Sequence, residues 1–147
     1  MLRAFPDTPD NSLTGASWID IVDPIPAEIA TFEKAFGLRV PTKEEVSEIE
    51  TTSRLRVEHG ALYMSAPLIL ATGDEPWIVA PTGFVLSKTA LLTVRFVQSA
   101  IFDSARKELN VGPLASTVVY VCVLEELVDH MADLLKQAVR LLMTPHT

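Results

Sequence analysis

A change in hydrophobic period at Arg54 constrains the fold of this 147-residue chain most strongly. Apolar residues in the 26–36 segment recur every three or four positions, which predicts an amphipathic helix. From Arg54 to Leu70 they alternate with polar residues, and His59-Gly60 interrupts the alternation near its start. This pattern is typical of two half-buried antiparallel strands joined by a tight turn. The chain therefore combines helices with at least one antiparallel hairpin.

The other strands and helices are predicted on both sides of this hairpin. Strands are expected at 2–5, 18–22, 77–80, 83–86 and 91–96, and helices at 26–36, from Thr42, at 101–109 and at 116–143. Pro81 separates the third and fourth of these strands. In the last segment, residues 117–123 are β-branched enough for a strand, but the apolar residues from Leu124 onward follow helical spacing, and one long helix is predicted.

The fold class predicted from these elements is α/β. The expected architecture is a layered α/β/α sandwich around a mixed, largely antiparallel sheet, with a long C-terminal helix. At this length one domain over 1–147 is expected, with the sheet and short helices in about 1–112 and the long helix in about 116–143.

Composition and motifs exclude several functions. Nineteen acidic and twelve basic side chains give a net charge of −7, which disfavours nucleic acid as a partner. No G-x-S-x-G, P-loop, GxGxxG, HExxH or paired CxxC motif occurs, so an enzyme is not expected. The single cysteine, Cys122, lies in an apolar run and is interpreted as a small buried side chain. No uncharged apolar run is long enough to cross a bilayer.

The short acidic helix is the first candidate metal site. Thr42 and Glu45 have the spacing of a capping box, which fixes the helix start. Glu44, Glu45 and Glu48 are the candidate ligands for a hard cation such as Mg²⁺, which prefers one or two carboxylates and retained waters. Consecutive acidic positions spread around a helix, so they cannot all face one ion. Capping and solubility are the alternative interpretation of these carboxylates.

A second acidic constellation lies on the long helix. Glu126 and His130 are four residues apart, and so are Glu125, Asp129 and Asp133, which places possible oxygen and imidazole ligands in neighbouring columns. A solvated helix face explains the same pattern, because like charges at this spacing cost only a few tenths of a kcal/mol. We favour the solvated face.

Several of these segments, in this order, resemble the cytoplasmic domain of CorA-type magnesium transporters. They are Trp18-Ile19-Asp20, the helix at 26–36, the Pro-led acidic segment 41–54, the hairpin at 54–70 and Leu91-Leu92-Thr93-Val94-Arg95. The resemblance covers about residues 1–96. It implies a cytosolic regulatory and metal-sensing domain that gates magnesium, and also cobalt, transport from the cytoplasmic face of the inner membrane.

The resemblance also implies a weak regulatory Mg²⁺ (or Co²⁺ or another divalent cation) between neighbouring subunits of a homopentamer. Glu48 stands where the family has the magnesium-binding Asp, and Ser47 replaces the Glu that precedes it. The second carboxylate comes from a helix that this chain does not reach, and the Gly-Met-Asn pore signature is absent. Sensing and gating, rather than conduction, are therefore expected here, with membrane contact only through transmembrane helices missing from the chain.

Two points stay open at this stage. A free-standing soluble α/β module for ligand binding or subunit interaction, without a transport role, is the alternative function. The fragment is expected to be either a monomer or self-associated through its last helix.

Overall fold

The computed structural model describes residues 1–7, 13–47, 55–70, 77–109 and 114–144. Within them, six strands form one sheet: β1 (Leu2–Phe5), β2 (Trp18–Val22), β3 (Leu55–Glu58), β4 (Ala61–Leu70), β5 (Ile78–Leu86) and β6 (Leu91–Arg95). The strand order is β1-β2-β6-β5-β4-β3. Only the β2–β6 pair is parallel and the other four pairs are antiparallel, so the predicted mixed, largely antiparallel sheet is confirmed.

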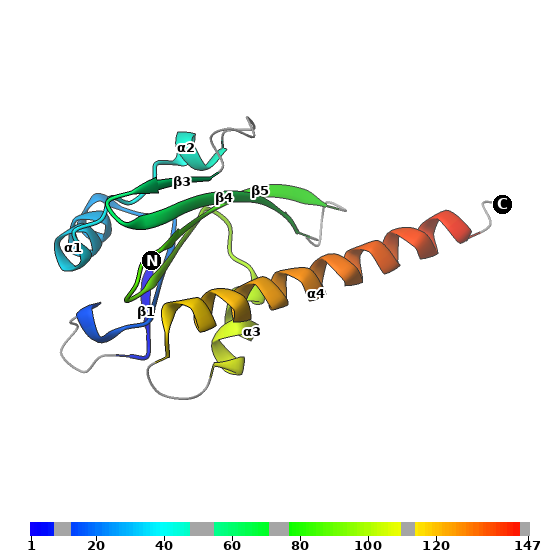
Figure 1. Cartoon of the computed structure of the whole chain (residues 1–147). Helices are drawn as coiled ribbons and strands as arrows, with labels where there is room; N and C mark the ends of the chain where they lie inside the picture. Colours follow the sequence, from blue (N-terminus) through cyan, green and yellow to red (C-terminus); the bar gives the residue numbers. More distant parts are fainter. Residues whose placement is uncertain (8–12, 48–54, 71–76, 110–113, 145–147) are drawn as a thin grey trace.

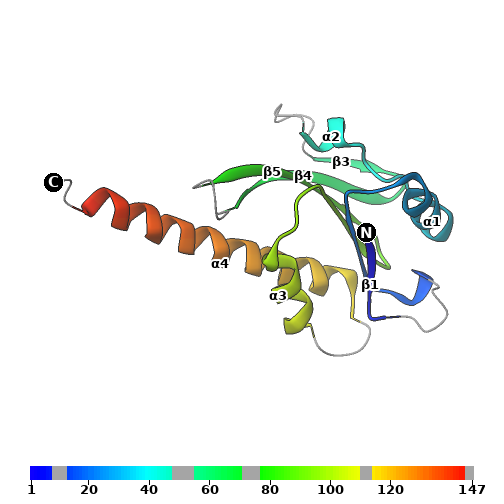
Figure 2. The same ribbon diagram turned by 180° about the vertical axis from the view of Figure 1, so that it is seen from behind.

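Helices cover both faces of this sheet (Figure 1). The helices are α1 (Pro26–Phe36), α2 (Lys43–Ser47), α3 (Ala100–Glu108) and α4 (Ser116–Met143), and a short 3₁₀ turn spans Leu13–Gly15. Helices α1 and α2 lie on one face and α3 and α4 on the other, as the view from behind also shows (Figure 2). The α/β fold with a long C-terminal helix is thus confirmed.

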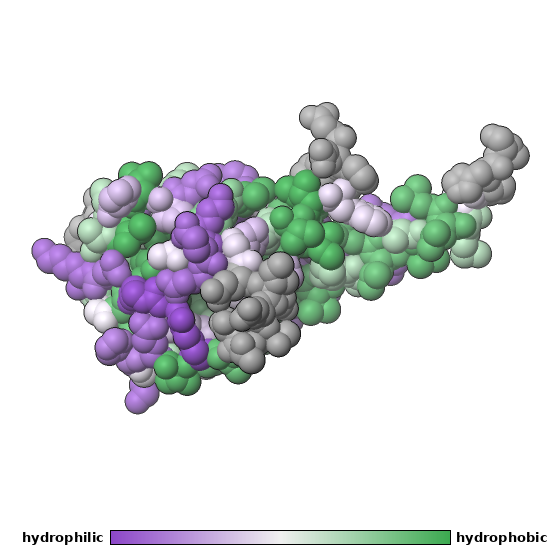
Figure 3. Space-filling view, turned by 90° about the horizontal axis from the view of Figure 1, so that it is seen from above, coloured by the Kyte–Doolittle hydropathy of each residue, from purple (hydrophilic) through white to green (hydrophobic). Residues whose placement is uncertain are grey.

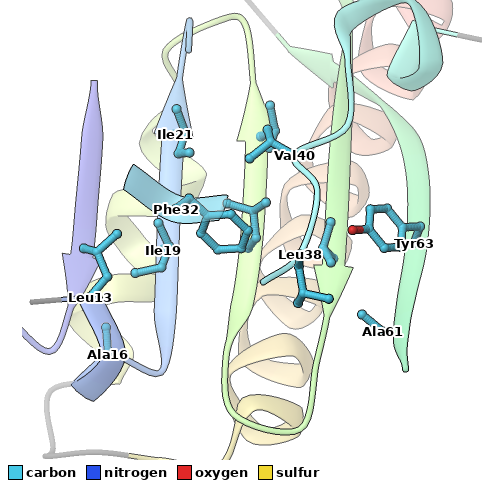
Figure 4. Packing of buried hydrophobic residues seen from close by; sticks show 12 residues of the cluster. Leu13, Ala16, Ile19, Ile21, Phe32, Leu38, Val40, Ala61 and Tyr63 are labelled. Carbon is cyan, nitrogen blue, oxygen red and sulfur yellow. The ribbon is translucent and has the colours of Figure 1, made fainter. Parts of the chain in front are cut away.

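The sheet separates two apolar cores. In the first, Phe32 of α1 lies over Ile19 and Ile21 of β2, and Leu38 and Val40 extend the cluster toward Tyr63 (Figure 4). In the second, Trp18 and Leu91 of the sheet pack with Phe102 of α3 and with Val119 and Val123 of α4. Successive side chains of a strand point to opposite faces of the sheet and so enter the two cores in turn. For this reason the central strands β2 and β6 are buried at every position.

Helix ends follow the local sequence. Pro26 occupies the first turn of α1, and Gly37 closes that helix with a φ of 65°, the left-handed conformation that glycine adopts without a steric cost. Ser99 caps α3 by accepting a hydrogen bond from the Ile101 amide. The last turns of α4 extend past the edge of the sheet (Figures 1 and 2). None of the described helices is long and apolar enough to cross a membrane.

One predicted boundary is wrong. Pro81 does not divide the segment into two strands, because β5 is continuous and Pro81 pairs with Pro67 of β4. In the described ladders, β6 pairs with β5 only over Thr82–Leu86, and β3 pairs with β4 only over Ala61–Met64. Pro81 therefore lies beyond the described β5–β6 ladder, and Pro67 lies beyond the described β3–β4 ladder. At these positions the missing N–H of proline removes no hydrogen bond of those ladders.

Candidate functional site

The acidic helix α2 approaches β5 closely because residue 83 is a glycine. Val46 is the buried residue of α2. A Cβ built on Gly83 would lie 2.9 Å from Val46 Cγ2 and 3.4 Å from Pro41 Cγ, so a side chain here would force the Val46 side chain or the helix that carries it to shift. This contact holds α2 on the same face of the sheet as α1 and leaves Glu44 exposed.

The predicted capping box is present at the start of α2. The Glu45 amide donates to Thr42 Oγ1 at 3.2 Å, and the Thr42 amide donates to Glu45 Oε1 at 3.3 Å. Two backbone donors that the helix itself leaves free are thereby satisfied.

Glu45 also takes part in a charge cluster that joins α2 to the hairpin. We call Arg39, Glu45, Arg56, Glu58 and Tyr63 the Arg39 cluster. Arg39 Nη1 and Nη2 donate to the two carboxylate oxygens of Glu45, the second at 3.0 Å, and Arg56 Nη2 donates to Glu45 Oε2. Arg39 Nε and Nη2 also donate to Glu58 at 3.1 and 3.0 Å. One guanidinium thus binds two carboxylates with paired hydrogen bonds.

Tyr63 of β4 forms the floor of this cluster. The guanidinium carbons of Arg39 and Arg56 lie 5.5 and 5.7 Å from its ring centre, within the range of cation–π attraction. Its hydroxyl donates to the Arg39 carbonyl at 2.7 Å. Burial is the main reason why the pKa of Tyr63 is raised.

These contacts change the acidity of both glutamates. Burial raises the pKa of Glu45, but the hydrogen bonds from Arg39, the Thr42 amide and Arg56 together outweigh it and lower the pKa from 4.5 to about 2. The hydrogen bond from Arg39 lowers the pKa of Glu58, and the bonds to Glu58 and Glu45 raise the pKa of Arg39. The cluster therefore stays ionised at neutral pH.

The three predicted magnesium ligands fall into different settings. Both oxygens of Glu45 accept bonds from guanidinium groups, so a cation would have to replace them. Glu44 is exposed in the first turn of α2, and Glu48 lies outside the described residues. Among the described residues, no three His, Cys, Asp or Glu side chains are placed to hold one metal ion. Glu44, Glu45 and Glu48 remain predicted ligands.

Sequence reasoning missed the Arg39 cluster. Its members lie 6, 11 and 19 residues apart, and only the turn at Gly37 and the β3–β4 hairpin bring them together. The available signal was that Arg39 and Arg56 flank the acidic segment on both sides.

The acidic residues of α4 lie partly in a cleft. Glu126, Asp129, His130 and Asp133 line a volume of about 370 Å³, across from Gln98, Ser99, Ser104 and other residues at the start of α3. His130 Nε2 lies 3.1 Å from the Ile69 carbonyl oxygen. Burial, followed by repulsion from Glu108, Asp129 and Glu125, raises the pKa of Glu126. The favoured solvated face thus describes Glu125, Asp129 and Asp133, which are exposed, whereas His130 packs against β4.

Cys122 lies on the side of α4 that faces α3. Its Sγ is 3.7 Å from the Ala105 carbonyl, and burial, followed by the charges of Glu126, Glu125 and Glu108, raises the pKa of the thiol. The thiol therefore lacks the electropositive surroundings of a reactive cysteine.

A buried polar network explains two of the sequence motifs. Asp20 of β2 lies beside Thr93 of β6 in the parallel register. Arg95 binds Asp20 through Nε at 3.1 Å and Nη2 at 2.8 Å, and the Thr93 hydroxyl donates to Asp20 Oδ1 at 2.7 Å. The Trp18 indole donates to Thr93 Oγ1 at 3.0 Å. The Trp-Ile-Asp and Leu-x-Thr-x-Arg motifs thus form one buried hydrogen-bond network between β2 and β6.

No family model matches the chain. Curated relatives do: it is 29% identical over 107 residues to the magnesium transport protein CorA of Wolinella succinogenes, an alignment that covers 70% of this chain and 33% of that protein. The CorA protein of Campylobacter jejuni strain RM1221 is 28% identical over 104 residues, with 65% and 32% covered. The chain therefore spans about a third of the length of these relatives.

Solved structures share the fold. The soluble domain of CorA from Methanocaldococcus jannaschii matches with a TM-score of 0.66 and 17% identity over 84% of this chain and 51% of that one. Full-length CmaX matches with a TM-score of 0.67 and 17% identity, over 85% and 39%. The cytoplasmic domain of ZntB from Vibrio parahaemolyticus gives 0.57 and 16%, over 84% and 53%. The chain is homologous to CorA magnesium transport proteins and has the fold of the soluble domain of CorA and ZntB.

Proposed function

We propose that this chain is the cytosolic regulatory domain of a CorA-type magnesium transporter, and that Mg²⁺ at its acidic helix favours the closed state. The sequence similarity to CorA proteins over 107 residues is the observation that supports this most. The proposal includes a single domain over 1–147, a place at the cytoplasmic face of the membrane, assembly into a pentamer, and a response to Co²⁺ as well as Mg²⁺.

The Arg39 cluster supports different roles for the glutamates of the acidic segment. Glu45 is neutralised by Arg39 and Arg56, so it serves the fold. Glu44 is exposed and unneutralised in the described structure, and Glu48 follows it by four residues in the sequence. We assign Glu48, aided by Glu44, to cation sensing.

One or two exposed carboxylates hold Mg²⁺ weakly, because the ion gives up its waters reluctantly. A neighbouring subunit would supply the remaining carboxylate. Mg²⁺ would then bind the assembled closed state more tightly than the open state. This difference in affinity sets how far binding shifts the equilibrium toward the closed state.

A Mg²⁺ titration of the purified chain, followed by two-dimensional NMR, tests this assignment. We expect fast-exchange shifts centred on Glu44 and Glu48, with a dissociation constant on the order of 1 mM or weaker. Glu48→Ala should abolish them, and NaCl at equal ionic strength should not reproduce them. Shifts confined to the α4 cleft, or unchanged in Glu48→Ala, would contradict the assignment.

The coding sequence beyond Thr147 separates the proposal from a free-standing module. A CorA-type transporter requires a long charged helix, two apolar segments of roughly 20 residues and Gly-Met-Asn. A stop codon at that point would favour the free-standing subunit-interaction module instead.

A further inference from the structure

Arg39 is held in place by contacts that do not involve the acidic helix. Its Nε and Nη2 donate to Glu58 of β3 at 3.1 and 3.0 Å, and its guanidinium carbon lies 5.5 Å from the centre of the Tyr63 ring. The same guanidinium donates to both oxygens of Glu45, with Nη2 3.0 Å from Oε2. The β3–β4 hairpin therefore fixes an arginine where it can bind the carboxylate of α2.

The other donors to Glu45 come from Arg56 and Thr42. Arg56 Nη2 donates to Oε2, and its guanidinium carbon lies 5.7 Å from the centre of the Tyr63 ring. The amide and the hydroxyl of Thr42 donate to Oε1 at 3.3 and 3.2 Å. Both oxygens of Glu45 thus accept several hydrogen bonds. A cation that bound this carboxylate would have to displace two guanidinium groups.

Burial alone does not keep an ion away from Glu45. Its side chain is 28% exposed, and the side chains of Arg39 and Arg56 that cover it are 36% and 44% exposed. The side of the domain that carries α2 faces the viewer in Figure 3, and hydrophilic side chains gather over it. A hydrated ion therefore has access to this part of the surface, and the two arginines are what stands between it and the carboxylate.

We propose that Arg39 and Arg56 set the Mg²⁺ affinity of the acidic helix by withholding Glu45 from the ion. In the sequence, Glu45 follows Glu44 directly and precedes Glu48 by three residues, so its carboxylate is the nearest further ligand to the two that we assign to sensing. The affinity of a carboxylate site for a divalent cation rises with the number of charged ligands. A site that lacks Glu45 is filled only when Mg²⁺ is abundant, so the arginines place its response at high Mg²⁺ concentrations.

This inference rests on the proposed function, because the acidic helix must bind Mg²⁺. It adds that two arginines outside the helix, neither of them a ligand, act as positioning residues and decide how tightly the ion is held. Arginine suits this role because its planar guanidinium binds both oxygens of one carboxylate, whereas a lysine ammonium acts as a point charge.

Mg²⁺ titrations of the purified chain, followed by two-dimensional NMR, test the proposal. We expect Arg39→Met to bind Mg²⁺ several-fold more tightly than the wild type, and Glu45→Gln to abolish this gain when it is added to Arg39→Met. Glutamine preserves the capping box, and in the wild-type background the same substitution should change the dissociation constant little. Arg39→Lys should fall between the wild type and Arg39→Met.

Lys43→Met is the matched control for net charge. Lys43 is exposed on α2, so its replacement removes one positive charge beside Glu44 without freeing an oxygen of Glu45. We expect a smaller gain in affinity than for Arg39→Met, and this gain should persist when Glu45→Gln is added. Equal gains in the two variants, with the same response to Glu45→Gln, would show that charge alone sets the affinity and would overturn the proposal.

A second variant keeps the test decisive if Val46 resonances show that α2 leaves the sheet in Arg39→Met. Arg56→Gln removes one of the bonds to Glu45 Oε2 and keeps those from Arg39, so it should give a smaller gain that again requires Glu45. An affinity that neither variant raises, beside wild-type shifts that depend on Glu48, overturns this inference and leaves the proposed function intact. A wild type without such shifts contradicts the proposed function, whereas a gain that requires Glu45 would still support the withholding of Glu45.

Discussion

Glu45 is the residue on which the acidic helix depends, because it caps α2 and binds two arginines at once. Its carboxylate links the helix start to the segment after α1 and to β3. A glutamate in that position stabilises the fold and has little freedom left for a cation.

Replacing Glu45 tests this role through pH. A carboxylate whose folded pKa is lowered from 4.5 to about 2 contributes stability above pH 4.5 and loses that contribution as the pH falls toward 2. We expect Glu45→Ala to lower the free energy of unfolding by about 1 kcal/mol at neutral pH. The difference from wild type should shrink between pH 4.5 and 2 in urea unfolding. Glu44→Ala is the control and should cost little; equal effects of both variants would refute the division between these glutamates.

Replacing Asp20 tests how much the buried network between β2 and β6 stabilises the fold. Asp20→Ala leaves Arg95, whose side chain is 3% exposed, buried without its charge partner. Removing one member of such a pair costs about 3–5 kcal/mol. The double variant Asp20→Leu with Arg95→Met should recover much of this loss, because no unpaired charge remains. Chemical denaturation of the three chains measures both quantities. A double variant as unstable as Asp20→Ala alone would mean that the unpaired charge is not the cause.

At the scale of elements, the contact of α2 with β5 depends on Gly83. Gly83→Ala should destabilise the chain by about 1–3 kcal/mol, because the new Cβ would approach Val46 Cγ2 to within 2.9 Å. Val46→Ala removes that atom, so the two substitutions together should cost less than the sum of their separate costs. Thermal melts of the single and double variants decide this. Strict additivity would show that the glycine is not required by the helix contact.

Elements with a clear period or cap were predictable from the sequence alone. The hairpin turn at His59-Gly60, the end of α1 at Gly37 and the extent of α4 all follow from local patterns, and the structure confirms them. The continuity of β5 through Pro81 was not predictable, because it depends on where the neighbouring ladders end. The capping box was likewise local, whereas the Arg39 cluster needs the folded hairpin to bring Arg56 to Glu45.

At the scale of the whole molecule, the sheet separates two surfaces with different chemistry. One face presents α2 and the Arg39 cluster, where Arg39 and Arg56 neutralise Glu45 and Glu44 is exposed. The other face carries α4, whose outer side leaves apolar side chains such as Val128, Leu135 and Leu142 exposed. Because the sheet lies between these two faces, we expect substitutions on one face to leave the contacts of the other face intact.

Magnesium-inhibited ion flux tests the central claim most directly. The chain would replace the matching segment of Wolinella succinogenes CorA, and flux would be recorded in proteoliposomes as internal Mg²⁺ rises. We predict that Mg²⁺ inhibits the chimaera, and that Glu48→Ala shifts the half-inhibiting concentration upward by several-fold, whereas Glu45→Ala lowers stability without a comparable shift. Inhibition of Glu48→Ala at the same Mg²⁺ concentration as the unmodified chimaera would contradict the account.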